Sequence, residues 1–501
     1  MSLLHILPLD GMSILFLILN CIVLIYILNR DKASKNFPPG PRALPLVGNI
    51  FSLDMKRPFQ TLMELKEKYG SVFSIQMGLK KMVVLCGYET VKEAFISQAD
   101  QFAERPDIPI FKEITKGNGI IFGHGDSWRT LRRFTLTVLR DLGMGKQNIE
   151  EKIIEESEHL LKHFEGQNGQ PFLTTIPLNA ATSNIIVSLI MGHRMEYEDE
   201  NFIKLLVFNC ENFRLIGGPF IQLYNMYPML HILPGPHRKV LKHQESTKDF
   251  FRNIFMRHRV VLDENDKRSY IDNFMSKMKE EEGNPGSHFH ELNLLTSVTN
   301  LFVAGTETTS NTLSWGLLIM IKYPHIQVKV HEEIDRVIGG TTPRTQHRPM
   351  MPFTDAVIHE TQRFADIFPM GLPHETTSDV VLRGYCIPKG TYIIPLLRSV
   401  HRDKDHWEKP DEFHPQHFLN EQGKFVKREA FMPFSAGRRV CVGEALARME
   451  LFLFFTSLLQ RFSFHTPEGV KGEDIELSSS GGLNLAPAKL HVRALPRSIN
   501  A

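Results

Sequence analysis

The stretch that decides the fold is FSAGRRVCVGE, residues 434–444, in which one cysteine stands among two glycines, two arginines and a phenylalanine. A buried structural thiol needs only apolar neighbours, so the glycines and arginines require another explanation. Glycine lets a backbone approach a bulky group closely, and arginine binds carboxylates. The pattern predicts that Cys441 is a thiolate ligand beside a large, flat, anionic group; a structural cysteine is the alternative.

The other cysteines and the charge balance exclude several classes of protein. Cys21, Cys86, Cys210 and Cys386 are scattered, with no C-x-x-C pair, which argues against a disulfide scaffold or structural zinc and favours a reducing compartment. The chain has 58 Lys and Arg against 56 Asp and Glu. It is therefore not expected to bind nucleic acid, and an electrostatic partner would have to recognise a local patch.

The N-terminus has the pattern of a membrane anchor. Residues 12–28 carry no charge, which is near the short limit for a membrane span. Asp10 precedes this segment, whereas Arg30, Lys32 and Lys35 follow it. Positive charge tends to stay on the cytosolic side, so we expect a signal anchor with the remaining chain in the cytosol. The alternative, a cleaved signal peptide, usually carries its positive charge in front.

The remaining chain divides into a short linker and one large domain. We expect a signal-anchor helix over residues 1–30, a stiff proline-rich linker over 31–49 and a catalytic domain over 50–501. Residues 71–77 and 81–86 predict two strands of a hairpin. The spacing of apolar residues further along is mostly helical, and no Gly/Ser-rich linker divides the body. The predicted fold class is mainly α with a minor β part (α+β).

The segment from Pro219 to Pro234 is apolar, nearly uncharged and bounded by prolines. It could be a buried loop or short core helix. It could also be a second membrane contact beside a substrate entrance, because aromatic and aliphatic side chains favour the membrane interface. The sequence leaves both interpretations open.

The cysteine window resembles the haem-thiolate signature of the cytochrome P-450 family, in its family-2 branch. The residues that carry the resemblance are Phe434, Gly437, Arg439, Cys441 and Gly443. The resemblance implies a haem b cofactor with the Cys441 thiolate as its axial metal ligand. It also implies that Arg439 pairs with a haem propionate, that Phe434 packs near the thiolate, and that Gly443 allows the backbone to come close.

Further residues match haem-contacting positions of that family. Trp128 and Arg132 are four apart, so they share a helical face and could both donate to a propionate. Arg105 and His374 match two more propionate positions. Each of these residues alone has an ordinary structural interpretation, and the cysteine window is what favours the functional one.

A second family feature is structural. Glu360 and Arg363 lie three apart in HETQR and can form a charge-assisted pair. In the family this pair joins the loop that here reads KPDEFHPQHF. The family's usual loop arginine is His417 in this chain, as is common in family 2, so we expect a weaker and more pH-sensitive interaction with Glu360.

The long helical segment His290–Lys322 contains AGTETTS, beginning at Ala304. Glycine and threonine are poor helix formers, so we expect a helix locally opened above the iron, where Ala304 and Gly305 leave space for dioxygen. Glu307 and Thr308 would form an acid–alcohol pair that delivers protons during oxygen activation. The alternative is a threonine-rich turn whose hydroxyls bond to its own carbonyls. The acid–alcohol pair favours a monooxygenase over a haem-thiolate isomerase or a haem sensor.

Monooxygenation requires electrons, and the sequence has no dinucleotide or flavin motif. The resemblance implies NADPH–cytochrome P-450 reductase as the donor, with cytochrome b5 as a second candidate; NADPH would act only through the reductase. Arg129, Arg133 and Arg140 fall within about 40° of one another on a helical wheel, with Trp128 and Arg132 to one side. This basic stripe is either a solvated face or a docking surface for an acidic partner.

The residues at the family's pocket positions are apolar, and none is a cation that could anchor a carboxylate. We therefore expect lipophilic substrates, with fatty acids, steroids and foreign compounds all open, and a location at the endoplasmic reticulum membrane with the catalytic domain on its cytosolic face. The pocket candidates are Ile121, Phe122, Val303, Phe368, Met370, Leu372 and Leu483.

Overall fold

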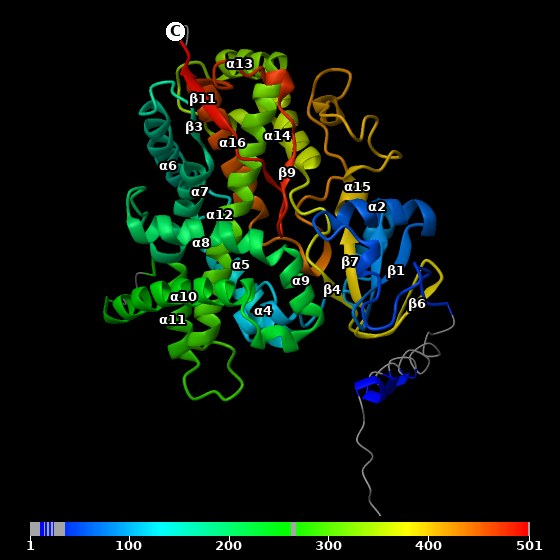
Figure 1. Cartoon of the computed structure of the whole chain (residues 1–501). Helices are drawn as coiled ribbons and strands as arrows, with labels where there is room; N and C mark the ends of the chain where they lie inside the picture. Colours follow the sequence, from blue (N-terminus) through cyan, green and yellow to red (C-terminus); the bar gives the residue numbers. More distant parts are fainter. Residues whose placement is uncertain are drawn as a thin grey trace, which may run out of the picture.

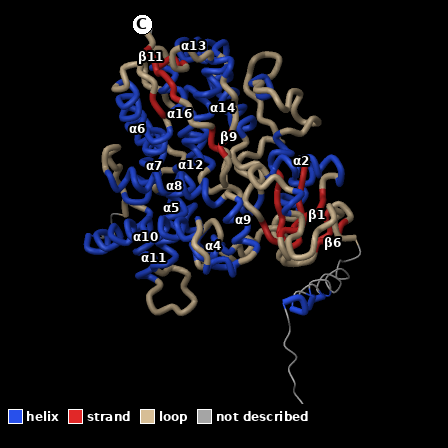
Figure 2. The backbone as a smooth tube through the Cα atoms, in the orientation of Figure 1, coloured by secondary structure: helices blue, strands red, loops and turns tan. Residues whose placement is uncertain are grey.

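The computed structural model describes residues 36–261 and 267–498, with a few positions between 11 and 24. Figure 1 shows a large helical body beside a smaller β-rich corner, and Figure 2 shows several of the strands gathered in that corner. This confirms the predicted mainly helical fold with a minor β part. The predicted anchor over residues 1–30 falls mostly outside the described residues. Within the described part of the chain, no helix is long and apolar enough to span a bilayer.

Helices make up most of the body, and several begin with proline, whose fixed φ suits the first helical position. Their bounds are α2 Pro58–Tyr69, α3 Tyr88–Lys92, α4 Pro109–Thr115, α5 Gly125–Asp141, α6 Gln147–Glu165, α7 Thr175–Met191, α8 Glu200–Ile216, α9 Pro219–Met226, α10 Pro236–Val261, α11 Tyr270–Glu280, α12 Glu291–Lys322, α13 Pro324–Val337, α14 Pro352–Ala365, α15 Leu397–His401 and α16 Glu444–Arg461.

The strands form small sheets, and the largest has the order β1-β2-β7-β4. The predicted hairpin is confirmed: β1 and β2 are antiparallel, with Val72 opposite Leu85, and Gly78 takes a positive φ of 59° in the turn. Strand β2 also pairs in parallel with β7, far along the chain. The bounds are β1 Val72–Met77, β2 Lys80–Cys86, β3 Phe172–Leu173, β4 His374–Glu375, β5 Val380–Leu382, β6 Tyr385–Ile387, β7 Tyr392–Leu396, β8 Phe462–His465, β9 Ser479–Ser480, β10 Ala486–Pro487 and β11 His491–Pro496.

Helix α12 is the central element, and its predicted extent is correct to within one residue. The ring of His290 caps its first turn by accepting from the N–H of Asn293, and Pro324 follows its end. The helix is buried along nearly its whole length, as expected of a helix surrounded by others. At 1.5 Å per residue it is about 48 Å long, long enough to cross the whole body.

The predicted local opening of α12 was wrong, because the helix continues through residues 304–310 without a break. The hydroxyls of Thr306 and Thr308 donate to carbonyls four residues earlier, each at 2.7–2.8 Å. Gly305 lies against α7: a Cβ there would come within 2.4 Å of Ile186 Cγ1. Glycine at this position therefore permits close helix packing, and the threonine hydroxyls bond to carbonyls of their own helix, as in the alternative interpretation.

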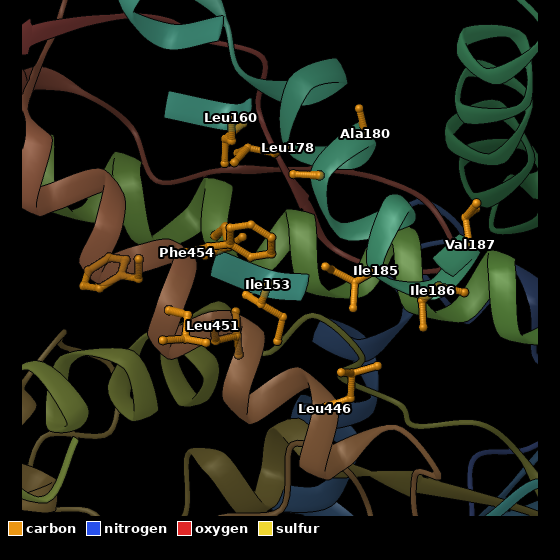
Figure 3. Close-up of a cluster of buried hydrophobic side chains, with 14 of the residues drawn as sticks. Ile153, Leu160, Leu178, Ala180, Ile185, Ile186, Val187, Leu446, Leu451 and Phe454 are labelled. Carbon is orange, nitrogen blue, oxygen red and sulfur yellow. The ribbon is translucent and has the colours of Figure 1, made fainter. Parts of the chain in front are cut away.

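The largest cluster of buried apolar side chains surrounds α12. Figure 3 shows side chains of α6, α7 and α16 packed together beside it. This packing holds the end of α16 that follows Cys441 against the helix that carries Glu307. The labelled side chains are Ile153, Leu160, Leu178, Ala180, Ile185, Ile186, Val187, Leu446, Leu451 and Phe454.

The Pro219–Pro234 segment combines features of both interpretations. Its first half is α9, where Ile221 and Tyr224 are buried. Its second half includes the 3-10 helix Pro228–Ile232, where Met229 and Ile232 are 71% and 68% exposed. One half of the segment therefore belongs to the core, and the other presents an apolar surface.

Candidate active site

The Cys441 loop is held in place by backbone contacts. The N–H of Cys441 donates to the carbonyl of Phe434 at 3.1 Å. Gly437 has a φ of 77°, and a Cβ there would lie 2.1 Å from the carbonyl oxygen of Phe95, so only glycine fits. At Gly443, a Cβ would merely touch the Cys441 sulfur at 3.9 Å. Close packing thus explains the first glycine of the motif, and the second starts α16.

The Cys441 thiol lies deep among protein atoms, and this burial raises its pKa. The N–H of Gly443 and the charge of Arg132 act in the opposite direction. The residue as a whole nevertheless keeps exposed surface, so the rest of the protein does not fully cover this loop. A thiol with backbone donors and a cation nearby can become a thiolate when a metal binds it.

Three arginines meet beside this loop. Arg439 donates to the carbonyls of Ala103 and Gly123 and stacks 3.5 Å above the centre of the Trp128 ring. Arg105 donates to two carbonyls just before β4, and Arg132 donates to the carbonyl of Val440. Four residues predicted to bind the cofactor, two from α5 and two from distant loops, therefore lie together.

The arginine cluster has more positive charge than its neighbours compensate. Burial and the charge of Arg132 lower the pKa of Arg105 to about 9, and burial and Arg105 lower that of Arg439 to about 8. Glu104 is the carboxylate that contacts the cluster. Burial acts to raise its pKa, but a hydrogen bond from His124 and the charge of Arg439 lower it to about 2. The site is therefore suited to further anions.

An unpaired donor points to the same conclusion. Trp128 is buried and its indole N–H has no hydrogen-bond partner among the described residues. Buried donors are normally paired. An acceptor beside Trp128 would satisfy this group, so the residues present fit a cofactor that carries two carboxylates, as haem b does.

His374 would need to change its protonation state to join such a site. Its Nδ1 lies 2.7 Å from the carbonyl oxygen of Phe102, which can only accept, so Nδ1 carries the proton. Burial, followed by the charge of Arg105, lowers its pKa well below the usual value. Nε2 is then an acceptor. Carboxylates placed nearby would favour protonation and make Nε2 a donor.

The predicted structural pair forms. Glu360 and Arg363 make two hydrogen bonds, at 2.7 and 2.8 Å, with neither side chain exposed. Arg363 also donates to the carbonyls of His401, Pro410 and Glu412. His417 Nδ1 lies 3.2 Å from each Glu360 carboxylate oxygen, so the predicted contact with the loop is present. The pair joins α14 to the chain that leads to Cys441.

On α12, Glu307 and Thr308 point to different partners. Thr308 Oγ1 donates to the carbonyl of Ala304 at 2.8 Å. The buried carboxyl of Glu307 accepts from Cys210 of α8 and from Asn311, each at 3.3 Å. Burial raises the pKa of Glu307, which keeps a proton available on it at higher pH than usual.

The predicted pocket residues do not all pack together. Phe122 stacks on Phe111 of α4 with ring centres 4.0 Å apart. Leu483 packs beside α4 and α9, and its N–H donates to the carbonyl of Phe213 on α8. Ile121 and Val303 pack on the central cluster.

The three pocket candidates of the loop before β4 are placed differently from these. Met370 packs on the sheet cluster around Leu396, away from the others. The carbonyl of Leu372 accepts a hydrogen bond from Arg105, and Phe368 is half-buried in the same loop.

Helix α5 has one buried and one exposed face, as its spacing predicts. Trp128 is buried and Arg132 half-buried on the side of the Cys441 loop, whereas Arg129, Arg133 and Arg140 are exposed. Of these three, Arg129 is paired with Asp126 at 2.9 Å. A helix that contacts the cofactor site therefore presents a basic stripe to solvent.

Sequence reasoning missed the residues that surround Glu307 and Phe122. Cys210 and Asn179 come from α8 and α7, and Phe111 from α4. None stands in a motif, and no spacing along the chain connects these residues to their partners.

A family model described as Cytochrome P450 matches residues 38–493. The chain is 50% identical to Cytochrome P450 2K4 of Oncorhynchus mykiss over 462 residues, which is 92% of each chain. It is 46% identical to Cytochrome P450 2F3 of Capra hircus, covering 96% of this chain and 99% of that one. It is also 44% identical to Cytochrome P450 2G1 of Oryctolagus cuniculus, covering 96% and 98%. The similarity thus extends over nearly the whole chain.

Proposed function

This chain belongs to the cytochrome P450 family and is a monooxygenase similar to its family-2 members. From that premise we propose which of its residues bind the cofactor and take part in the reaction. Cys441 binds the iron of haem b, and the enzyme inserts one oxygen atom of dioxygen into lipophilic substrates by hydroxylation or epoxidation. The observation that carries the proposal is a cysteine in a loop next to two buried arginines, Arg105 and Arg439, with the half-buried Arg132 and an unpaired indole N–H beside them.

The arginine cluster would hold the cofactor through its carboxylates. Arg105, Arg132 and Arg439 are directed there from three separate parts of the chain, and Trp128 adds a neutral donor. Charge-assisted hydrogen bonds are about twice as strong as neutral ones, so these groups would fix the orientation of the ring. When bound, the haem supplies the activation of dioxygen and the oxidation of the substrate.

Glu307 and Thr308 would deliver protons to the reaction. Glu307 is buried and its raised pKa favours the protonated form, which suits a proton donor. The Thr308 hydroxyl can pass a proton on because it both donates and accepts. Ala304, whose carbonyl accepts from Thr308, and Gly305, which packs on α7, would set the position of this turn.

Thr308→Ala is expected to uncouple the enzyme. NADPH consumption should continue, because electron delivery does not pass through the hydroxyl, while product per NADPH falls and hydrogen peroxide accumulates. General acid assistance is worth about 10²–10⁴-fold, so a water that partly replaces the hydroxyl would still leave a measurable drop. Thr308→Ser should keep most of the coupling. An alanine variant as tightly coupled as the unaltered enzyme would leave the hydroxyl with only its structural bond to Ala304.

The residues at the predicted pocket positions support lipophilic substrates held by shape and burial. All of them are apolar, and Phe122 stacks on a further aromatic ring, Phe111 of α4. Fatty acids, steroids and foreign compounds share this chemistry. Turnover of a panel of such compounds by the reconstituted enzyme would choose among them.

A redox partner belongs with the family, and we propose NADPH–cytochrome P-450 reductase, with cytochrome b5 as a second donor. The exposed Arg129, Arg133 and Arg140 would steer an acidic surface onto α5. On α5 that surface lies only about 60–100° around the helix axis from Trp128 and Arg132, so docking there would bring the donor close to the cofactor.

Changing these three arginines to glutamate should slow reductase-driven turnover by about tenfold or more at low salt, while peroxide-driven turnover stays near its original rate. A matched control changes Lys204, Lys242 and Arg259, which are exposed on α8 and α10, and alters the net charge equally. Equal losses in both assays would indicate a haem or folding defect and contradict docking at α5.

We further propose an endoplasmic reticulum location with the catalytic domain in the cytosol. The uncharged run over residues 12–28 followed by basic residues supports an N-terminal anchor. The exposed Met229 and Ile232 support a second contact with the membrane surface. The Tyr227 hydroxyl donates to the carbonyl of Leu46 at 2.8 Å, so the segment with Met229 and Ile232 lies beside the proline-rich linker.

A further inference from the structure

A series of side-chain hydrogen bonds leads to the carboxyl of Glu307. The Cys210 thiol on α8 donates to Glu307 Oε2 at 3.3 Å, and Asn311 donates to Oε1 at 3.3 Å. The amide of Asn179 on α7 donates to the Cys210 sulfur at 3.0 Å. Ser310 donates to the Asn179 carbonyl oxygen. Three helices therefore meet at one acid.

Cys210 occupies a special place in this series. It is half-buried, whereas Glu307 and Asn179 are fully buried, so it is the member closest to solvent. Burial, and then the charge of Glu307, raise the pKa of the Cys210 thiol. The thiol therefore keeps its proton and acts as a hydrogen-bond donor.

We propose that Cys210 is a positioning residue for Glu307, whose thiol holds the carboxyl in the orientation from which it serves the reaction. The inference rests on the proposed role of Glu307 in proton delivery. Without the thiol, Oε2 would lose its donor from α8, and the orientation of the buried carboxyl would depend on the amides of Asn311 and Asn179 alone.

The backbone of α12 is held at this point by other bonds. Thr182 of α7 donates to the carbonyl of Thr306 at 2.9 Å, and Asn209 of α8 donates to that of Val303 at 3.4 Å. Changing Cys210 should therefore leave α12 in place and alter only the carboxyl.

The pKa of the Glu307 carboxyl distinguishes the proposed role of Cys210 from a purely structural one, because a structural role of Cys210 would leave this pKa unchanged. The groups facing its carboxyl are the thiol of Cys210 and the neutral amides of Asn179 and Asn311. Glu450 of α16 contacts Thr309 instead, and the charge of Lys489 acts on Cys210. Burial raises the pKa of Glu307, and the bond from Cys210 lowers it. Loss of this bond should raise the pKa further.

The first experiment measures product per NADPH from pH 6 to about pH 9. In Cys210→Ala we expect the yield of product per NADPH to fall by roughly 3- to 10-fold, which is part of the 10²–10⁴-fold that general acids contribute. We also expect the decrease of this yield in alkaline solution to occur at higher pH. Cys210→Ser keeps a donor and should restore both features. Cys386→Ala, at another half-buried cysteine, is the control. A wild-type yield and pH profile in Cys210→Ala would overturn the inference.

The second experiment does not depend on activity. The rate of Cys210 alkylation by iodoacetamide is followed by peptide mass spectrometry at the alkaline end of the pH range, where Glu307 is ionised. It should rise severalfold in Glu307→Gln, because a carboxylate no longer raises the pKa of the thiol. Cys386 in the same digest is the internal reference. An unchanged Cys210 rate would contradict the contact.

The two proposals fail differently. If Glu307→Gln and Thr308→Ala both stay coupled, proton delivery by this pair is wrong, and the positioning role of Cys210 is wrong with it. If both uncouple while Cys210→Ala behaves as the unaltered enzyme, only the inference about Cys210 falls.

Discussion

Replacing Cys441 with serine is expected to abolish the strongly red-shifted Soret band that the reduced enzyme forms with carbon monoxide. The band requires electron donation from a thiolate to the iron, and a serine hydroxyl stays protonated and binds iron weakly. Serine is nearly the size of cysteine, and the loop is held by the Cys441 N–H and by Gly437, so the fold should survive. Difference spectra at equal protein concentration measure the effect, and substrate oxidation should be lost with the band.

The control for this experiment is Cys386→Ser, which changes a half-buried cysteine in β6. That variant should keep the full band. Survival of the band in Cys441→Ser would mean that another residue binds the iron, and would remove the basis of the proposed site.

The second large effect is expected for Arg363→Ala. It would leave Glu360 fully buried without its two hydrogen bonds from Arg363, and the carbonyls of His401 and Glu412 would lose their arginine donor. Breaking a buried ion pair by removing one partner costs about 3–5 kcal/mol. We expect a decrease of that size in the free energy of unfolding, measured by urea denaturation, together with poor haem retention.

A matched control is Arg129→Ala, which removes an arginine from another pair three residues apart, but one that is largely exposed. Exposed pairs contribute about 0–1 kcal/mol, so its stability should hardly change. Equal, small effects of the two substitutions would show that the buried pair does not support the fold.

The pH dependence of this effect has a definite sign. Burial raises the pKa of Glu360, but the hydrogen bonds from Arg363 and His417 lower it overall. A carboxyl with a lowered pKa stabilises the fold above its unfolded value of about 4.3 and loses that contribution as the pH falls through its folded value. The stability difference between Arg363→Ala and the unaltered enzyme should therefore shrink in acid.

Features coded by local spacing were predictable from the sequence. The hairpin around Gly78, the extent of α12 and the two faces of α5 each follow from periodicity or from a stop signal a few residues away. The Glu360–Arg363 pair is one turn of helix apart, so its contact follows from helical geometry alone. The cysteine window belongs to the same class, because its glycines and arginines act within one loop.

Features that depend on packing between distant segments were not predictable in this way. The sequence suggested that AGTETTS opens the helix, but a residue of α7, Ile186, fills the space beside Gly305 and the turn stays closed. Met370 likewise packs on the cluster of apolar residues around Leu396 in the β-rich corner, a contact that its own loop sequence does not indicate.

The sequence by itself indicated the proposed cofactor ligand, the mainly helical body and the residue types of the proposed acid–alcohol turn, because each is contained in a few neighbouring residues. Only the tertiary structure decided that Cys210 donates to Glu307, 97 residues away in the chain. The same holds for Arg105, Arg132 and Arg439, which lie together beside the Cys441 loop. The reason is physical. A side chain's partner on another helix is chosen by how α7 and α8 pack on α12, and that packing optimises the burial of the whole core, which leaves no local pattern in the chain.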